Sequence, residues 1–266
     1  MKSYRRIFRM DAVRTFAAPK FFLSVFLVTA LCVLCSWKDL SLAFFRNNRT
    51  DVTYIFSMMM ALGAFKNMIL LAAAFPGAGS FCSDWNHQFI RPVCIRCGVR
   101  KYSHSKVVFC AGSVFLTVFL GMLLYVFLLV AFRIPLLGEN GKGVVDPLYG
   151  PLLTGDFPLL YFLVKIFLLS VASAFWGIVG LLISSWIPNY FVAVSAPFIS
   201  YYLLGEFGEY LPDFMNFRML AYGYDVVSQG IGVTMLYTVL FFGLFSFIVG
   251  KLFQRNMQRR VANELF

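Results

Sequence analysis

The chain has 266 residues, of which 60 % are hydrophobic and only 13 % are charged, and 32 of them are phenylalanine. An average soluble domain carries roughly twice that share of charged residues, so the composition excludes an ordinary soluble globular protein. The formal net charge of +11 suits either a nucleic-acid partner or the cytoplasmic face of a membrane protein, and the positions of the charges decide between the two.

The N-terminal segment, residues 1–20, carries six Lys and Arg residues among aromatic and aliphatic ones. This mixture is typical of an amphipathic helix that lies on the cytoplasmic membrane surface. A cleavable signal peptide is the alternative. However, the apolar run that follows, 21–37, is longer than a usual signal segment, and no A-x-A-like cleavage site follows it. We therefore predict an interfacial helix over 1–20 and a first membrane span over 21–37.

Further apolar runs long enough to cross hydrocarbon follow along the chain. In a bilayer such runs must be helical, because every backbone N–H and C=O group has to be paired internally. The predicted second, third and sixth spans are 54–75, 107–132 and 232–250.

Residues 159–204 form a longer apolar stretch whose only charged residue is Lys165. As one helix it would be about twice as long as the hydrocarbon core is thick. It must therefore double back, and Pro188, which cannot continue a helix, marks the reversal. We predict a fourth span over 159–183 and a fifth over 188–204.

The distribution of Lys and Arg between the two sides of the membrane tests this topology. With the N-terminus inside, the cytoplasmic segments are 1–20, 76–106, 184–189 and 251–266, and the outer segments are 38–53, 133–158 and 205–231. The inner set contains 15 Lys and Arg against three acidic residues, and the outer set contains six against nine. The positive-inside rule therefore favours six spans over five, with both ends in the cytoplasm. The basic charge is explained without nucleic acid.

Metal and catalytic motifs are sparse. Cys94 and Cys97, with His87 and His104 nearby, offer part of a zinc site, but a second ligand pair at a regular spacing is missing. All six cysteines fall within spans or on the cytoplasmic side, so no disulfide framework is predicted. The sequence also lacks H-E-x-x-H, G-x-S-x-G and a complete phosphate loop. We expect no metal, cofactor or catalytic residue in this chain, which makes an intramembrane enzyme the weakest interpretation.

Two lysines fall within predicted spans. Lys66 is near the middle of the second span, and Lys165 is about two turns into the fourth. A charge at such depth is costly unless it is paired or hydrated, so both are candidate polar sites within the membrane. No acidic residue lies in any span, so we expect a partner among backbone carbonyls, water, another subunit or a substrate. Snorkelling to the interface is the alternative, above all for Lys165.

The coupling loop, residues 76–106, joins the second and third spans. Phe81, Trp85 and Phe89 recur every four residues, which predicts a short helix with one aromatic face, ended by Pro92. Such a helix either docks on a partner or touches only lipid. A basic cluster then leads into the third span at the membrane border: Arg100, Lys101 and Lys106.

This loop resembles that of the permease subunits of type-2 ATP-binding-cassette (ABC) exporters. In that family an acidic residue opens a coupling helix after the second span, and a small-Gly-Val-x-Arg-x-x-Tyr-x-x-Ser-Lys-like stretch enters the third. The residues that fit are Asp84, Arg91, Gly98, Val99, Arg100, Tyr102, Ser105 and Lys106. His87 and Gln88 stand where the family usually has Gly-Thr, and the spacing around Arg100 is one residue short. The motif covers about a tenth of the chain, while the layout of spans agrees throughout.

The resemblance implies a function. A separate ATPase subunit, which carries ATP and Mg, would bind the loop through Phe81, Asp84, Trp85, Phe89 and Arg91. A second permease subunit, identical or homologous, would complete the unit in a bacterial plasma membrane. An amphipathic or hydrophobic substrate would be exported, and residues 205–231 would form the re-entrant outer helices of such permeases. The alternative is a channel or a secondary carrier that ATP does not drive.

Overall fold

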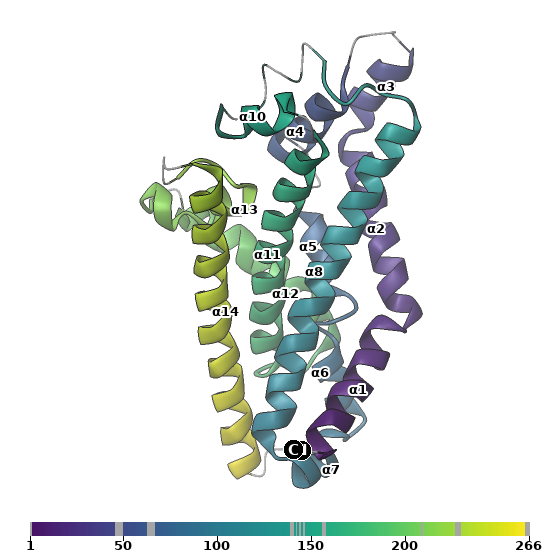
Figure 1. The fold of residues 1–266 in the computed structure, drawn as a ribbon. Coiled ribbons are helices and arrows are strands. Elements are labelled where there is room, and N and C mark those ends of the chain that lie inside the picture. The colour runs from purple at the N-terminus through teal and green to yellow at the C-terminus, as the bar shows by residue number, and fades with distance from the viewer. Residues whose placement is uncertain are drawn as a thin grey trace.

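The computed structural model describes residues 2–45, 50–62, 67–138, 141, 143, 145, 147–155, 158–208, 210–226 and 230–263. All regular structure in these ranges is helical. Figure 1 shows the long helices running side by side along one axis, with the start of α1 and the end of α14 at the same end of the bundle. We call this end, which also carries α6 and α7, the basic end.

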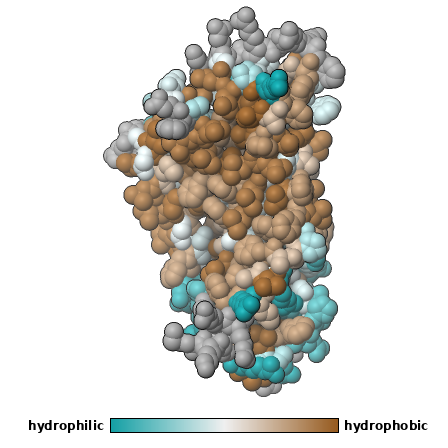
Figure 2. All heavy atoms as spheres, turned by 45° about the vertical axis from the view of Figure 1, so that its right-hand side comes forward, coloured by the Kyte–Doolittle hydropathy of each residue, from teal (hydrophilic) through white to brown (hydrophobic). Residues whose placement is uncertain are grey.

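Four helices within the described ranges are long and apolar enough to cross a membrane: α8 (Val99–Ala131), α11 (Leu159–Ser184), α12 (Tyr190–Gly208) and α14 (Ile231–Ala262). The number rises to five if α1 (Lys2–Phe16) and α2 (Pro19–Cys35), which meet at a bend of 46°, form one span. The prediction of an all-α, multi-pass membrane protein is therefore confirmed at this level. Figure 2 agrees, since hydrophobic residues cover the middle of the visible face and hydrophilic ones gather at the basic end.

The predicted second span, 54–75, corresponds to two shorter helices. α4 (Val52–Leu62) and α5 (Met68–Ala74) lie on either side of residues 63–66, which are outside the described ranges. A helix of seven residues is only about 10 Å long, so α5 cannot cross a bilayer by itself.

Two helices extend well beyond the predicted spans. α8 begins at Val99 rather than 107, directly after Gly98, whose φ of 82° breaks the preceding helix. α14 continues to Ala262 rather than 250, so most of the predicted basic tail, 251–266, is helical. Neither extension contains Pro or Gly, and Arg259 and Arg260 in the last turn of α14 suit the negative end of the helix dipole.

In the connections at the other end, the elements that fall within the described residues are short. They are α3 (Trp37–Phe45), η1 (Pro147–Tyr149), α10 (Gly150–Thr154), η2 (Asp213–Met215) and α13 (Phe217–Tyr222).

Helix α11 occupies the centre of the bundle, where it packs on α8, α12 and α14. Two glycines allow this close approach. A Cβ at Gly177 would lie 2.7 Å from a methyl of Val114 on α8, and one at Gly180 would lie 2.6 Å from the ring of Pro197 inside α12. Small residues at such positions are the usual means by which membrane helices pack closely.

Candidate functional site

Two short helices, α6 (Ser80–Asn86) and α7 (Ile90–Cys97), form the coupling loop at the basic end of the bundle (Figure 1). The prediction of a single helix ended by Pro92 is wrong. The break comes at Gln88, whose φ of 55° is left-handed, and the amide of Phe89 closes the turn on the carbonyl of Asp84. Pro92 lies in the first turn of α7, where its missing N–H has no helical partner to lose.

The predicted coupling residues do not share one exposed face. Phe81 is fully buried and packs edge-on against Phe253 of α14, with ring centroids 5.8 Å apart. Asp84 is buried, and Trp85 is half-buried beneath the guanidinium of Arg260, 4.9 Å from its ring centroid. Only Phe89 and Arg91 are exposed. Helix α6 is therefore fixed to the bundle, and the surface open to a partner lies further along the chain.

A buried ion cluster fixes α6 to α1 and α8. Its members are Asp11, Arg14, Asp84, Tyr102, Ser105 and Lys106. Lys106 Nζ lies 2.7 Å from Asp84 Oδ2 and 3.1 Å from Asp11 Oδ1. Arg14 Nη1 donates to Asp84 Oδ1 at 3.0 Å, Tyr102 donates to Asp84 Oδ2 at 3.0 Å, and Ser105 donates to Asp11 Oδ2 at 2.6 Å.

The cluster balances its own charges. Asp11, Asp84 and Lys106 are each at most 3 % exposed, and burial of an unpaired charge would cost several kcal/mol. Two carboxylates face Lys106 and Arg14, and the hydroxyls supply further hydrogen bonds. Of the predicted basic cluster, Lys106 is buried among these partners, whereas Arg100 and Lys101 are exposed at the start of α8. Their place at the membrane border stays a prediction. Sequence analysis also missed Asp11, although it is the only acid in residues 1–20 and stands three residues before Arg14.

The exposed surface of the coupling loop lies on the turn and on α7. We call Phe89, Arg91, Pro92, Ile95 and Arg96 the α7 ridge. All five are exposed, Ile95 by 82 %. Beside the ridge is a cavity of about 550 Å3, lined by Trp85, Asn86, Gln88, Ile90, Arg91 and Pro92. An exposed apolar side chain between two arginines suits a protein partner better than bulk solvent.

Lys165 is held near the opposite end of α11. Its Nζ donates to the carbonyl oxygens of Tyr222 at 2.9 Å and Gly223 at 3.1 Å, and it lies 3.9 Å from the ring centroid of Tyr149. These carbonyls belong to the C-terminal end of α13, where Gly223 adopts the left-handed conformation. Backbone carbonyls, one of the predicted kinds of partner, therefore bind this lysine. The other predicted intramembrane site, Lys66, lies outside the described residues.

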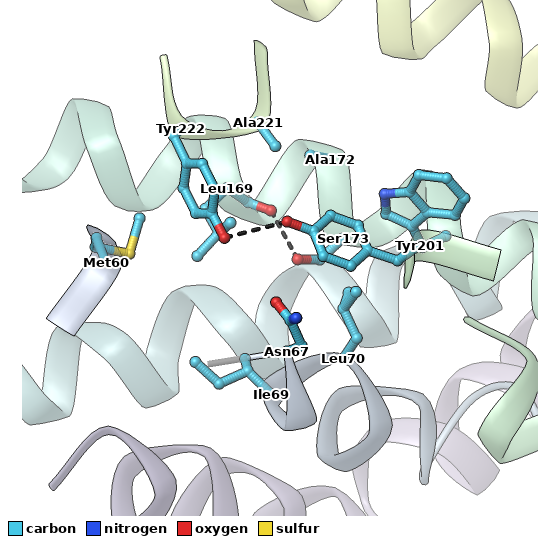
Figure 3. A pocket seen from close by; sticks show the side chains of 11 residues that line it. Met60, Asn67, Ile69, Leu70, Leu169, Ala172, Ser173, Tyr201, Ala221 and Tyr222 are labelled. Carbon is cyan, nitrogen blue, oxygen red and sulfur yellow. Dashed lines mark hydrogen bonds between the residues drawn. The ribbon is translucent and has the colours of Figure 1, made fainter. Parts of the chain in front are cut away.

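Two small cavities lie next to each other in this region, and Lys165 lines the first of them. One of about 80 Å3 is lined by Lys165 itself with Ser57 and Tyr161, and the next, of about 30 Å3, shares Met60 and Tyr222 with it. Figure 3 shows the second cavity, with the hydroxyls of Tyr201 and Tyr222 facing each other at 3.1 Å. A water takes up about 30 Å3 in the liquid, so these spaces are no larger than a few waters.

Two cysteines of the coupling loop, Cys82 and Cys94, are buried. Burial raises the pKa of the Cys82 thiol to about 11, and burial, followed by the nearby Cys97 and Asp84, raises that of Cys94 to about 11 as well. Within the part of the chain that the structure describes, no group of three His, Cys, Asp or Glu residues is arranged to hold a metal ion.

Comparisons of this chain with protein-family models, with curated proteins and with solved structures each find no match. The resemblance to exporter permeases therefore rests on the residues of the coupling loop and the order of the apolar segments.

Proposed function

We propose that this chain is the permease subunit of an ABC exporter, with six spans and both ends in the cytoplasm. In this arrangement α4, α5 and the residues between them form the second span, and α1 is the interfacial helix. A separate ATPase supplies ATP hydrolysis with its Mg. A second permease subunit completes the pathway for an amphipathic or hydrophobic substrate across a bacterial plasma membrane.

The observation that carries the proposal is the exposed α7 ridge beside a cavity of about 550 Å3, at the end of the bundle where the basic residues gather. A motor protein needs a protruding surface to hold and a rigid connection from that surface into the spans. The ridge offers the first. The ion cluster and the contact of Phe81 with Phe253 offer the second, because they join α6 to α1, α8 and α14.

The test is co-purification of this chain with an ABC ATPase from an adjacent reading frame of the same genome. Arg91→Glu and Ile95→Asp change only exposed side chains, so we expect both variants to fold and to bind at least about tenfold less ATPase, equivalent to about 1.4 kcal/mol. Arg255→Glu, an exposed arginine of α14 outside the ridge, is the matched control and should bind normally.

Each outcome decides a different point. If no ATPase binds the wild-type chain, the exporter proposal fails and an ATP-independent channel or carrier takes its place. If ATPase binds and both ridge variants bind it equally well, the docking surface is misassigned. An epitope inserted beside Ile95 that reacts only from outside the cell would overturn the topology.

A further inference from the structure

A separate cavity lies beside the ion cluster, where α1 meets α2 and α6 approaches the start of α12. Its volume is about 230 Å3, and its lining includes Arg14, Thr15, Lys20, Ser80, Ser83 and Tyr190. Since a water occupies about 30 Å3, this space holds a chemical group of several heavy atoms. Arg14 and Lys20 are exposed, so the cavity is open to the surface beside them.

The charges favour an anion. Five charged side chains line the cavity: Arg14, Lys20 and Lys106 are cationic, and Asp11 and Asp84 are acidic. Both carboxylates are already engaged in the ion cluster, at 2.7 to 3.1 Å from their cationic partners. Lys20 forms no ion pair within the described residues, and its Nζ lies 5.8 Å from the ring centroid of Tyr190. A net positive charge therefore remains at the mouth of the cavity.

Three hydroxyl groups add donors. Thr15 is only 5 % exposed, and Ser80 and Ser83 are half-buried. None of their hydroxyls makes a hydrogen bond to another part of the chain that the structure describes, unlike the hydroxyls of Ser24 and Ser105 on neighbouring helices. Their oxygens are open to the cavity rather than fully buried. Unpartnered donors beside a lysine are the usual surroundings of a phosphate or carboxylate oxygen.

The position of the cavity indicates that its ligand also has an apolar part. Lys20 is the second residue of α2, and the next turns expose Phe22, Leu23 and Phe26 by 55 to 62 %. Figure 2 shows the same change along the molecule, from a hydrophilic basic end to a hydrophobic middle. A ligand seated here would place its charged group among polar side chains and its apolar part along α2.

We propose that this cavity binds the phosphate of an anionic phospholipid. Lys20 and Arg14 face the phosphate, Thr15, Ser80 and Ser83 donate hydrogen bonds, and the acyl chains lie along the exposed face of α2. The site depends on the membrane alone, so it needs neither an ATPase nor a second permease. A bound lipid would fix the angle between the interfacial helix α1 and the first span.

The test is titration of the full-length purified chain in detergent with dioleoyl phosphatidylglycerol, with lipid-bound protein measured by native mass spectrometry. We expect phosphatidylglycerol to bind about tenfold or more tightly than phosphatidylcholine. Lys20→Gln combined with Ser80→Ala should weaken phosphatidylglycerol binding about tenfold, since one charge-assisted hydrogen bond contributes about 1.5–3 kcal/mol. Lys20→Arg should keep the binding, which separates loss of charge from misfolding.

Lys251→Gln is the matched control, because Lys251 is also exposed at the border of an apolar helix and lies 5.3 Å from an aromatic ring centroid, that of Phe247. It should bind as the wild type does. Equal affinity for the two lipids, or equal weakening by Lys251→Gln, would overturn the proposal. Full displacement of the lipid by glycerol 1-phosphate at the concentration of the lipid would also overturn it, since the cavity would then be a site for small phosphates.

Discussion

Two lysines of this chain, at opposite ends of the bundle, are buried to a similar extent but have different partners. Lys106 is 3 % exposed and lies within 3.1 Å of two carboxylates. Lys165 is 7 % exposed and donates hydrogen bonds to two backbone carbonyls, with an aromatic ring nearby. The first joins residues more than 90 positions apart into one ionic cluster, and the second holds the end of one short helix.

The two lysines differ in the groups that would lose a partner if the lysine were replaced. Without Lys106, two buried carboxylates would share a single remaining cation, Arg14. Without Lys165, the carbonyls of Tyr222 and Gly223 would lose donors but carry no net charge. Removal of one partner of a buried ion pair generally costs more than removal of a donor from a neutral acceptor. Lys106 should therefore matter for the whole fold, and Lys165 mainly for α13.

The largest effect is expected for Lys106→Met. Because Asp11 and Asp84 would stay buried with too little positive charge, the free energy of unfolding should fall by about 3–5 kcal/mol. Denaturant unfolding of the purified chain in detergent measures it. The matched control is Lys101→Met, which removes an exposed lysine of the same helix and should leave the midpoint almost unchanged.

A second substitution shows whether charge is the cause. Lys106→Met combined with Asp11→Asn removes one cation and one anion, so part of the lost stability should return. Identical midpoints for Lys106→Met and Lys101→Met would show that the ion cluster contributes nothing to the fold.

A smaller effect is expected for Lys165→Met. The loss of donors to two buried carbonyls should reduce the free energy of unfolding by about 1–3 kcal/mol. Hydrogen exchange should become faster in α13, because its C-terminal carbonyls are no longer capped. Lys251→Met, which removes a lysine near an aromatic ring but with no described ion pair, is the control for the loss of a cation from a ring. If Lys165→Met lowered the free energy of unfolding as much as Lys106→Met does, the two lysines would contribute equally to the stability of the fold, and the expected difference between them would be wrong.

The spans were easier to predict than either lysine's partners. Apolar length, together with the helix break at Pro188, placed the fourth span at 159–183, and α11 runs from Leu159 to Ser184. Apolar length alone set the boundaries of α8 and α14 too narrowly. Hydropathy indicates which residues lie in hydrocarbon, whereas the helix extends beyond them over polar residues, as far as Gly98 at the start of α8 and Ala262 at the end of α14.

The ion cluster had no local pattern from which to predict it. Asp84 and Lys106 are 22 positions apart, and Asp11 and Lys106 are 95 apart, so neither pair fits a helical spacing. The four-residue period of Phe81, Trp85 and Phe89 corresponds to a helix only from Phe81 to Trp85. The helix ends before Gln88, which adopts a left-handed backbone conformation that is uncommon for a residue other than glycine. For Lys165 the absence of acids in the spans did narrow the choice of partner, and backbone carbonyls were among the options.

The smallest effect is expected for the reactivity of the Cys94 thiol. Its labelling rate measures how far water reaches into the surroundings of Asp84. Cys94 is 8 % exposed, and burial, the neighbouring Cys97 and the charge of Asp84 together raise the pKa of its thiol from 9.0 to about 11. At pH 8 the thiolate fraction is then about one in a thousand, compared with about one in ten at the unshifted pKa, and the thiolate is the reactive form. Labelling of Cys94 by a soluble maleimide, followed by peptide mass spectrometry, should therefore be slow at pH 8, rise about tenfold per pH unit and level off above about pH 11.

The raised pKa of Cys94 also predicts the direction in which the stability of the fold changes with pH. Because the pKa is higher in the folded chain than in the unfolded one, the protonated thiol favours folding below about pH 9, and that contribution is lost as the pH rises through about 11. The unfolded chain in denaturant is the reference for the labelling rate. If Cys94 reacts at pH 8 as fast in the folded protein as in denaturant, water reaches the inner side of α7. Asp84 and Lys106 would then be a solvated pair, and the large effect expected for Lys106→Met would shrink to that of a surface ion pair, about 0–1 kcal/mol.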